Sequence, residues 1–143
     1  MIKKTSEARP LSAKVVNVNN NSQTDAYSCK YINQCNTYST SETFTGKYWI
    51  GGEPIYRKCF SGTLETSANN TFMTQIPDIK IPIRQYGCVY ASLTGYRMPF
   101  PVYVSSTNNI NCAVDNRNIP YIGYSDDKKG QYYIYVVEYI KTS

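Results

Sequence analysis

The chain has 143 residues, enough for one domain with a single core, and its formal net charge is a mild +5. Its basic clusters are short lysine pairs without interleaved aromatic residues, so nucleic acid is not an expected partner. The chain has no histidine, which excludes a Ser-His-Asp arrangement and a His-bound metal. Its five cysteines are an odd number and have no paired short spacing, which argues against a disulfide framework. We therefore expect no cofactor, no metal and no enzymatic activity.

The composition favours strands over helices. Tyrosine occurs 15 times, beside four phenylalanines and one tryptophan, while the strong helix formers alanine and leucine are scarce. No apolar run reaches the roughly 18 residues of a membrane span, and the polar sequence after residue 4 lacks the apolar centre of a signal peptide. We expect an all-β protein that is made in a cytoplasm and does not insert into a membrane.

Residues 1–23 are polar and asparagine-rich, and they contain too few apolar residues to become ordered alone. Part of this segment nevertheless has a strand-like apolar pattern, which can add as an edge strand to another protein. We therefore expect an N-terminal docking arm. The apolar residues assigned to it are Leu11, Val15, Val16 and Val18.

Residues 24–38 change to a helical period, with an apolar stripe that contains Tyr27, Tyr31 and Ile32. A helix of about three and a half turns does not persist alone in water, so its stripe must pack against something. Two alternatives stay open. Three copies can pack about a threefold axis and form a homotrimer, or the helix can pack on its own domain.

Residues 47–58 contain the only tryptophan and a Gly-Gly pair. Trp49 can bury more apolar area than any other side chain, so we expect it at the centre of the core. Gly51 and Gly52 permit positive φ angles and predict a two-residue hairpin turn. Pro54 then leads into a strand that begins near Ile55.

From residue 39 onward, turn signals recur at intervals of roughly eight to twelve residues, which is typical of a sandwich or barrel. We therefore predict an antiparallel β-sandwich head domain over residues 39–143. Pro99 and Pro101 make one strand an edge strand or a bulged entry. The expected strands cover 53–61, 71–76, 79–91, 96–104, 110–114, 118–125 and 131–141.

Several predicted loops are rich in Asn, Tyr, Ser and Asp, which suit a polar, sugar-like or protein ligand. Plain solvated hairpin loops have the same composition, so that alternative stays open. The candidate ligand-contact residues are Tyr96, Arg97, Asn108, Asn109, Tyr124, Asp126, Asp127 and Lys128.

The strand expected at 131–141 is apolar on both faces and is interrupted only by Glu138. Because a half-buried strand alternates apolar and polar residues, we expect one face in the core and the other against a neighbouring subunit. Tyrosine suits an interface, since its ring buries area while its hydroxyl stays hydrogen-bonded. The residues assigned to the subunit interface are Tyr27, Tyr31, Ile32, Tyr133, Tyr135 and Tyr139.

Glu138 is the one acidic residue inside a predicted strand. A carboxylate in a catalytic cleft is one interpretation, because glycoside cleavage requires only two carboxylates. We favour the other, a charge paired at an interface with one of Arg57, Arg84 or Arg97.

Three segments resemble the β-sandwich head domain common in phage and prophage fibre proteins. Residues 49–58, Trp-Ile-Gly-Gly-Glu-Pro-Ile-Tyr-Arg-Lys, are similar to the family's opening W-I-D-G-K-P-I-Y-R-K, although Gly52-Glu53 stands where Gly-Lys is more frequent. Residues 96–101 are similar to its F-x-P-L-P step, and residues 135–142 are similar to its closing L-E-Y-T-K-T-T. The resemblance covers roughly residues 40–143.

The resemblance implies a trimeric sandwich at the outer end of a virion appendage. The implied partners are a capsid or other virion protein, held by the arm, and a host-surface glycan or protein, met by the head. Since no shaft repeat occurs, we expect a short head fibre or decoration on the virion surface, assembled in the host bacterial cytoplasm. The alternatives are the tip of a tail fibre or baseplate protein, a decoration protein without a receptor and, more weakly, a glycan-active enzyme.

Overall fold

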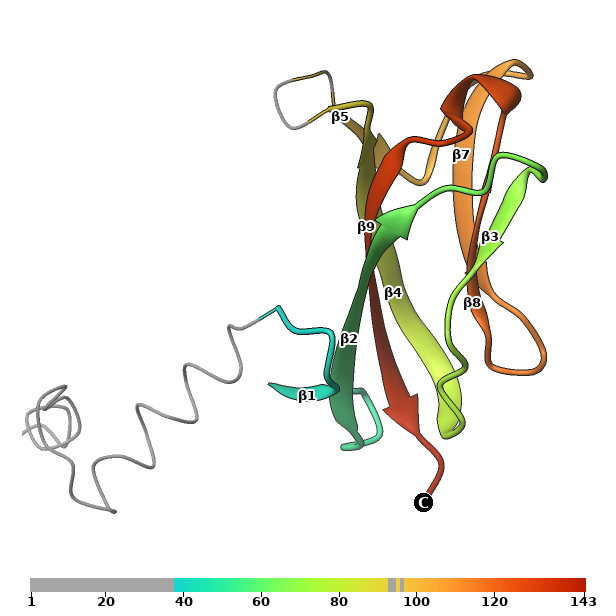
Figure 1. The fold of residues 1–143 in the computed structure, drawn as a ribbon. Helices are drawn as coiled ribbons and strands as arrows, with labels where there is room; N and C mark the ends of the chain where they lie inside the picture. Colours follow the sequence, from blue (N-terminus) through green and yellow to red (C-terminus); the bar gives the residue numbers. More distant parts are fainter. Residues whose placement is uncertain (1–37, 93–94, 96) are drawn as a thin grey trace, which may run out of the picture.

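The computed structural model describes residues 38–92, 95 and 97–143, which form two antiparallel sheets packed face to face (Figure 1). The predicted all-β sandwich is confirmed. The docking arm and residues 24–37 of the expected helix lie outside the described residues. Outside them too are the residues assigned to these segments: Leu11, Val15, Val16, Val18, Tyr27, Tyr31 and Ile32.

The larger sheet has five strands in the order β1-β2-β9-β4-β5. The central strand β9 pairs with β2 on one side and with β4 on the other. β1 was not predicted, because Gly46 resembles a turn residue; in the structure its φ of 75° falls where the register of β1 shifts. The bounds are β1 (Thr43–Tyr48), β2 (Pro54–Thr63), β9 (Tyr132–Lys141), β4 (Ile79–Tyr90) and β5 (Arg97–Phe100).

The smaller sheet has four strands in the order β3-β8-β7-β6. Figure 1 shows it packed against one face of the larger sheet, so its other face points away from the sandwich. A short 3-10 helix, η1 (Asp126–Lys128), connects β8 to β9. The bounds are β3 (Asn70–Phe72), β8 (Pro120–Tyr124), β7 (Asn108–Val114) and β6 (Val102–Ser105).

The strand expected at residues 96–104 is divided between the two sheets. β5 forms one edge of the larger sheet, β6 forms one edge of the smaller sheet, and the cis Phe100–Pro101 peptide bond lies between them. Proline has no backbone N–H to donate to a neighbouring strand, which restricts it to such positions. The predicted edge position is therefore confirmed.

The core face of β9 is the one that carries Tyr133, Tyr135 and Tyr139, all of which are buried. The Tyr135 hydroxyl donates to Gln85 Oε1 at 2.7 Å, and its ring centroid lies 5.6 Å from that of Phe100. The smaller sheet of the same chain covers these tyrosines, so their assignment to a subunit interface was wrong. Because both faces of β9 are apolar, its sequence does not show which face is turned inward.

The opposite face of β9 is partly open. Tyr132 and Ile134 are 49% and 43% exposed, and a pocket of about 420 Å³ lies on this face, lined in part by Tyr38, Tyr86 and Ile134. An apolar strand face of this kind is one that another surface can cover. If a neighbouring subunit meets β9, this is the face that is available.

Trp49 lies in the β1–β2 hairpin and is 38% exposed. The loop covers residues 49–53, because the Trp49 N–H donates to the Glu53 carbonyl and the Gly52 N–H donates to the Trp49 carbonyl, both at 2.8 Å. Gly52 has the positive φ, 83°, and Gly51 does not. The predicted turn exists but is longer than two residues. The core position of Trp49 was wrong, because the hairpin includes the edge strand β1.

Candidate functional site

Two of the predicted ligand loops meet at one end of the smaller sheet. The β6–β7 turn and the segment after β8 lie beside the loop that precedes β3, and together they enclose a polar hollow of about 340 Å³. We call it the end hollow. Its lining residues are Asn69, Ser106, Thr107, Asn109, Tyr124, Ser125 and Asp126.

Asn69 holds one wall of the end hollow in place. Its side-chain amide donates to the Tyr124 carbonyl at 3.0 Å and to Asp126 Oδ1 at 2.8 Å. Asp126 also pairs with Lys129 Nζ at 2.7 Å. Hydrogen bonds from Lys129 and Asn69 favour the carboxylate and hold the pKa of Asp126 below its usual value. Asn69 was not among the predicted contact residues, although the Asn-Asn pair at this turn was a usable signal.

Asn109 and Ser125 fix the opposite wall. The Asn109 amide donates to the carbonyls of Ser105 and Ser106 at 3.1 and 3.0 Å, which closes the β6–β7 turn. The Asn109 backbone N–H donates to Ser125 Oγ at 3.1 Å, and the Ser125 hydroxyl donates to Asp127 Oδ1 at 2.5 Å. The Asn109–Ser125 bond joins β7 to the segment after β8, and the other bonds hold each of the two loops in shape.

Three of the predicted contact residues have structural roles. The Tyr124 side chain is buried, and its hydroxyl donates to the Glu65 carbonyl at 2.9 Å and lies 2.8 Å from the Thr71 hydroxyl. Lys128 is buried and forms an ion pair with Asp127. Burial raises the pKa of Asp127, but the bonds from Lys128 and Ser125 outweigh it and keep that pKa below its usual value.

Asn108 and Arg97 do not line the end hollow. Asn108 begins β7, and its Oδ1 is buried without a hydrogen-bond partner among the described residues. Arg97 is exposed at the start of β5, with its guanidinium 5.8 Å from the centroid of the Tyr90 ring. Tyr96 lies outside the described residues.

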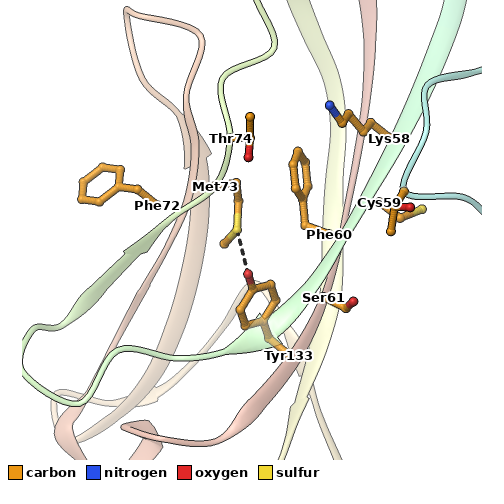
Figure 2. A pocket seen from close by; sticks show the side chains of 9 residues that line it. Lys58, Cys59, Phe60, Ser61, Phe72, Met73, Thr74 and Tyr133 are labelled. Carbon is orange, nitrogen blue, oxygen red and sulfur yellow. Dashed lines mark hydrogen bonds between the residues drawn. The ribbon is translucent and has the colours of Figure 1, made fainter.

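A second pocket, of about 400 Å³, opens between β2 and the segment that starts with β3. Figure 2 shows Phe60 and Met73 facing each other across it, whereas Phe72 points to the opposite side of β3. The Tyr133 hydroxyl donates to Met73 Sδ at 3.1 Å at the bottom. Lys58 Nζ lies 5.6 Å from the Phe60 ring centroid at the rim. This pocket is the open side of the core, and none of its residues was predicted to contact a ligand.

Glu138 pairs with Arg57, one of the three arginines expected as partners, and the pair lies inside one chain rather than at the expected interface. Arg57 Nε donates to Glu138 Oε1 at 2.9 Å, and Arg57 Nη2 lies 2.8 Å from the same oxygen. The Tyr38 ring covers the guanidinium, with its centroid 4.4 Å from Cζ. The pair lies within one chain, where its charges satisfy each other.

The carboxylates at and beside the end hollow are ionised. Asp126 and Asp127 have lowered pKa values, so they are charged near neutral pH and do not hold a proton for acid catalysis. Among the described residues no group of three Cys, Asp or Glu side chains is arranged to hold a metal ion. None of the helices in that part of the chain has the length and apolar character needed to cross a membrane.

No family model, curated protein or solved structure matches this chain. The likeness to fibre head domains is therefore limited to the three sequence segments.

Proposed function

We propose that the chain is a virion fibre protein whose β-sandwich head attaches to a glycan or protein on the host surface. The observation that carries the attachment role is the end hollow. It brings together Asn69, the turn at 106–109 and residues 124–126, which are far apart in the sequence. Polar loops held on a rigid sheet are a common way to present a binding surface.

The chemistry of the end hollow supports a polar ligand. Asparagine offers one acceptor and two donor positions, and serine and threonine hydroxyls both donate and accept. The outer edge of the hollow is exposed at Ser106, Thr107 and Asp126, so a ligand can reach these side chains. Hydroxyl and amide groups on a host-surface molecule match these partners.

The virion location is proposed from the fibre-like sequence segments alone. In this proposal the arm, residues 1–23, docks on a capsid or other virion protein, and residues 24–38 hold three copies together. A short head fibre is the form we favour, and the tip of a tail fibre or baseplate protein is the alternative. A decoration protein without a receptor is a second candidate function, because an end hollow can also be an ordinary solvated loop cluster.

Attachment is tested by incubating the labelled full chain with a panel of intact bacterial strains and measuring retention by flow cytometry. Ser106→Tyr fills the mouth of the end hollow, so we expect it to lower retention on the binding strain by about tenfold or more. Ser41→Tyr is the matched control, because Ser41 is exposed and lies outside the lining of the hollow, and it should retain full binding. Failure of the unmodified chain to bind any strain, with firm retention on purified particles, would favour the decoration protein.

A further inference from the structure

The four strands of the smaller sheet contain no charged residue. Their sequences are Asn-Thr-Phe in β3, Val-Tyr-Val-Ser in β6, Asn-Asn-Ile-Asn-Cys-Ala-Val in β7 and Pro-Tyr-Ile-Gly-Tyr in β8. Every strand of the larger sheet, in contrast, carries at least one charged residue. Soluble surfaces are usually rich in charged residues, so an uncharged solvent-facing sheet is unusual.

The strand register places amides and aromatic rings together on the outer face of this sheet. Asn70, Gly123 and Asn111 are direct neighbours across β3, β8 and β7. Phe72 and Tyr121 form a second cross-strand pair, two residues along the same strands. Residues that are paired or two apart along a strand share one face, so these side chains all point away from the core.

Gly123 is buried, and the carboxamides of its two cross-strand neighbours lie over it. A Cβ at this position would lie 2.5 Å from Asn111 Oδ1 and 3.1 Å from Asn70 Oδ1. Both asparagines are exposed, and within the described part of the chain neither carboxamide has a hydrogen-bond partner. Their donor and acceptor positions are therefore available to a molecule lying over this pair of asparagines.

Exposed aromatic rings lie on both sides of the Asn70 and Asn111 carboxamides. Phe72 is 56% exposed, and its ring centroid lies 5.4 Å from that of Tyr121 at an interplanar angle of 37°. On the other side, Tyr103 is 74% exposed and is the cross-strand partner of Asn109, which also lines the end hollow. Phe72 and Tyr103 are separated by four residues along the strands, roughly 14 Å, and by three strand spacings across the sheet, roughly another 14 Å, so the two rings lie about 20 Å apart.

We propose that this outer face binds a neutral oligosaccharide that runs from Phe72 across Gly123 toward Tyr103. The apolar C–H face of a sugar ring can lie on an exposed aromatic ring, and its hydroxyls can bond to the carboxamides of Asn70 and Asn111. The face offers no counter-charge to an anionic sugar, so removing such a sugar from water would be unfavourable. This inference rests on the proposed attachment function and names its ligand class.

The test is an amide NMR titration of the full chain with a panel of neutral oligosaccharides: linear glucose, galactose and N-acetylglucosamine oligomers. Sialylated and uronic-acid oligosaccharides serve as anionic comparators. We expect at least one neutral oligomer to shift the Gly123 backbone signal and the side-chain amide signals of Asn70 and Asn111. No shift with any neutral oligomer, or shifts confined to residues outside this face, overturns the proposal, as does binding of anionic oligomers alone.

Two variants separate ligand contact from folding. Gly123→Ala displaces the carboxamides of Asn70 and Asn111, and Phe72→Ala removes one aromatic ring, so each should weaken binding of the responding oligomer by about tenfold. Tyr48→Ala is the control, because Tyr48 is an equally exposed aromatic residue, 62% exposed, on β1 of the larger sheet. An equal loss of binding in Tyr48→Ala overturns the proposal, as does unchanged binding in both Gly123→Ala and Phe72→Ala.

The attachment function can fail separately from this inference. Oligosaccharide binding at Gly123 without retention on any bacterial strain would support the sugar face and contradict the attachment function. Retention that is lost in Ser106→Tyr, together with no response to any neutral oligomer, would support attachment and overturn the sugar face.

Discussion

Arg57 and Glu138 carry opposite charges on the side of the larger sheet that faces away from the smaller sheet. Both side chains are buried, and they occupy cross-strand partner positions on β2 and β9. A buried ion pair contributes little relative to a well-packed apolar pair, but removing one partner leaves an uncompensated charge. The pair therefore makes both residues intolerant of single changes.

Arg57→Ala should lower the free energy of unfolding by about 3–5 kcal/mol, because Glu138 would remain buried and unpaired. The measurement is urea unfolding at a fixed protein concentration. Lys80→Ala is the matched control, since its pair with Glu53 is partly exposed, and its removal should cost less than about 1 kcal/mol. Equal costs for the two variants would contradict a buried role for Arg57.

Glu42 gives the sandwich a pH dependence. Burial opposes ionisation of its carboxyl, but hydrogen bonds from Lys141 and Tyr139 outweigh it, so its pKa lies below the ordinary value of 4.5. A carboxyl with a depressed folded pKa stabilises the fold above its unfolded pKa, and this contribution disappears as the pH falls through the folded pKa.

Glu42→Gln should therefore be less stable than the unmodified chain near pH 7, and the two unfolding free energies should converge as the pH falls to about 3. Urea unfolding across this pH range measures the difference. Lys141→Met should produce a similar convergence, because it removes one of the partners that stabilise the carboxylate. A difference that stays constant from neutral to acid pH would contradict this role of Glu42.

At the scale of the elements, β4, β9 and β5 meet at Gly87, which is a partner of Tyr135 on one side and Phe100 on the other. A Cβ at Gly87 would collide with the Ile134 carbonyl oxygen and with the Phe100 ring. This carbonyl is part of the backbone that pairs β9 with β4, so moving it would disturb the pairing of the two strands. Gly87 is thus needed for the close approach of the three strands.

Gly87→Ala should destabilise the domain by about 1–3 kcal/mol, the usual cost of overfilling a packed core. Gly123→Ala is the matched control, because only the flexible ends of Asn70 and Asn111 lie near it, and it should change stability by less than about 1 kcal/mol. Thermal unfolding followed by circular dichroism compares them. A larger loss for Gly123→Ala than for Gly87→Ala would contradict the packing described here.

The positions of the long strands could be predicted from the sequence, but which face of a strand points into the core could not. The runs at 79–91 and 131–141 correspond closely to β4 and β9, because long alternating or β-branched runs between turn residues have few other options. β1 was missed because Gly46 interrupts it. Which face of β9 is inward depends on the smaller sheet, and the local pattern contains no information about that sheet.

The candidate site was predicted in part. Loop composition identified Asn109, Tyr124 and Asp126, which line the end hollow, but it also selected Lys128, which is buried by contacts that depend on the tertiary fold. The aromatic–amide face was missed because its residues lie in strands, where an alternating pattern indicates packing and carries no sign of a ligand. The absence of charge from these strands was readable in the sequence, but strand pairing was needed to bring Asn70 and Asn111 together.

At the scale of the whole molecule, the account assigns different surfaces to ligand and to assembly. The smaller sheet and the end hollow adjoin at Asn109 and are proposed to meet the ligand. The stripe with Tyr27, Tyr31 and Ile32 is proposed to hold three copies together. Assembly in threes would multiply weak single-site contacts, because linked sites bind with a raised effective concentration.

Light scattering of the full chain at micromolar concentration should give the mass of a trimer, about three times the 16.3 kDa of one chain. Mild oxidation should then cross-link neighbouring chains through Cys29 or Cys35, which lie beside the predicted stripe. Replacing both cysteines by serine is the control that removes the cross-link and keeps the mass. A monomer mass would contradict the trimer, and a cross-link within one chain would favour packing of the helix on its own domain.

The claim that the head is a sugar-binding display domain is tested most directly by an array of bacterial surface glycans, probed with the labelled full chain. The account predicts binding to neutral glycans, lost in Phe72→Ala and retained in Tyr48→Ala. No binding to any glycan, or binding restricted to anionic glycans and unchanged in Phe72→Ala, would contradict it.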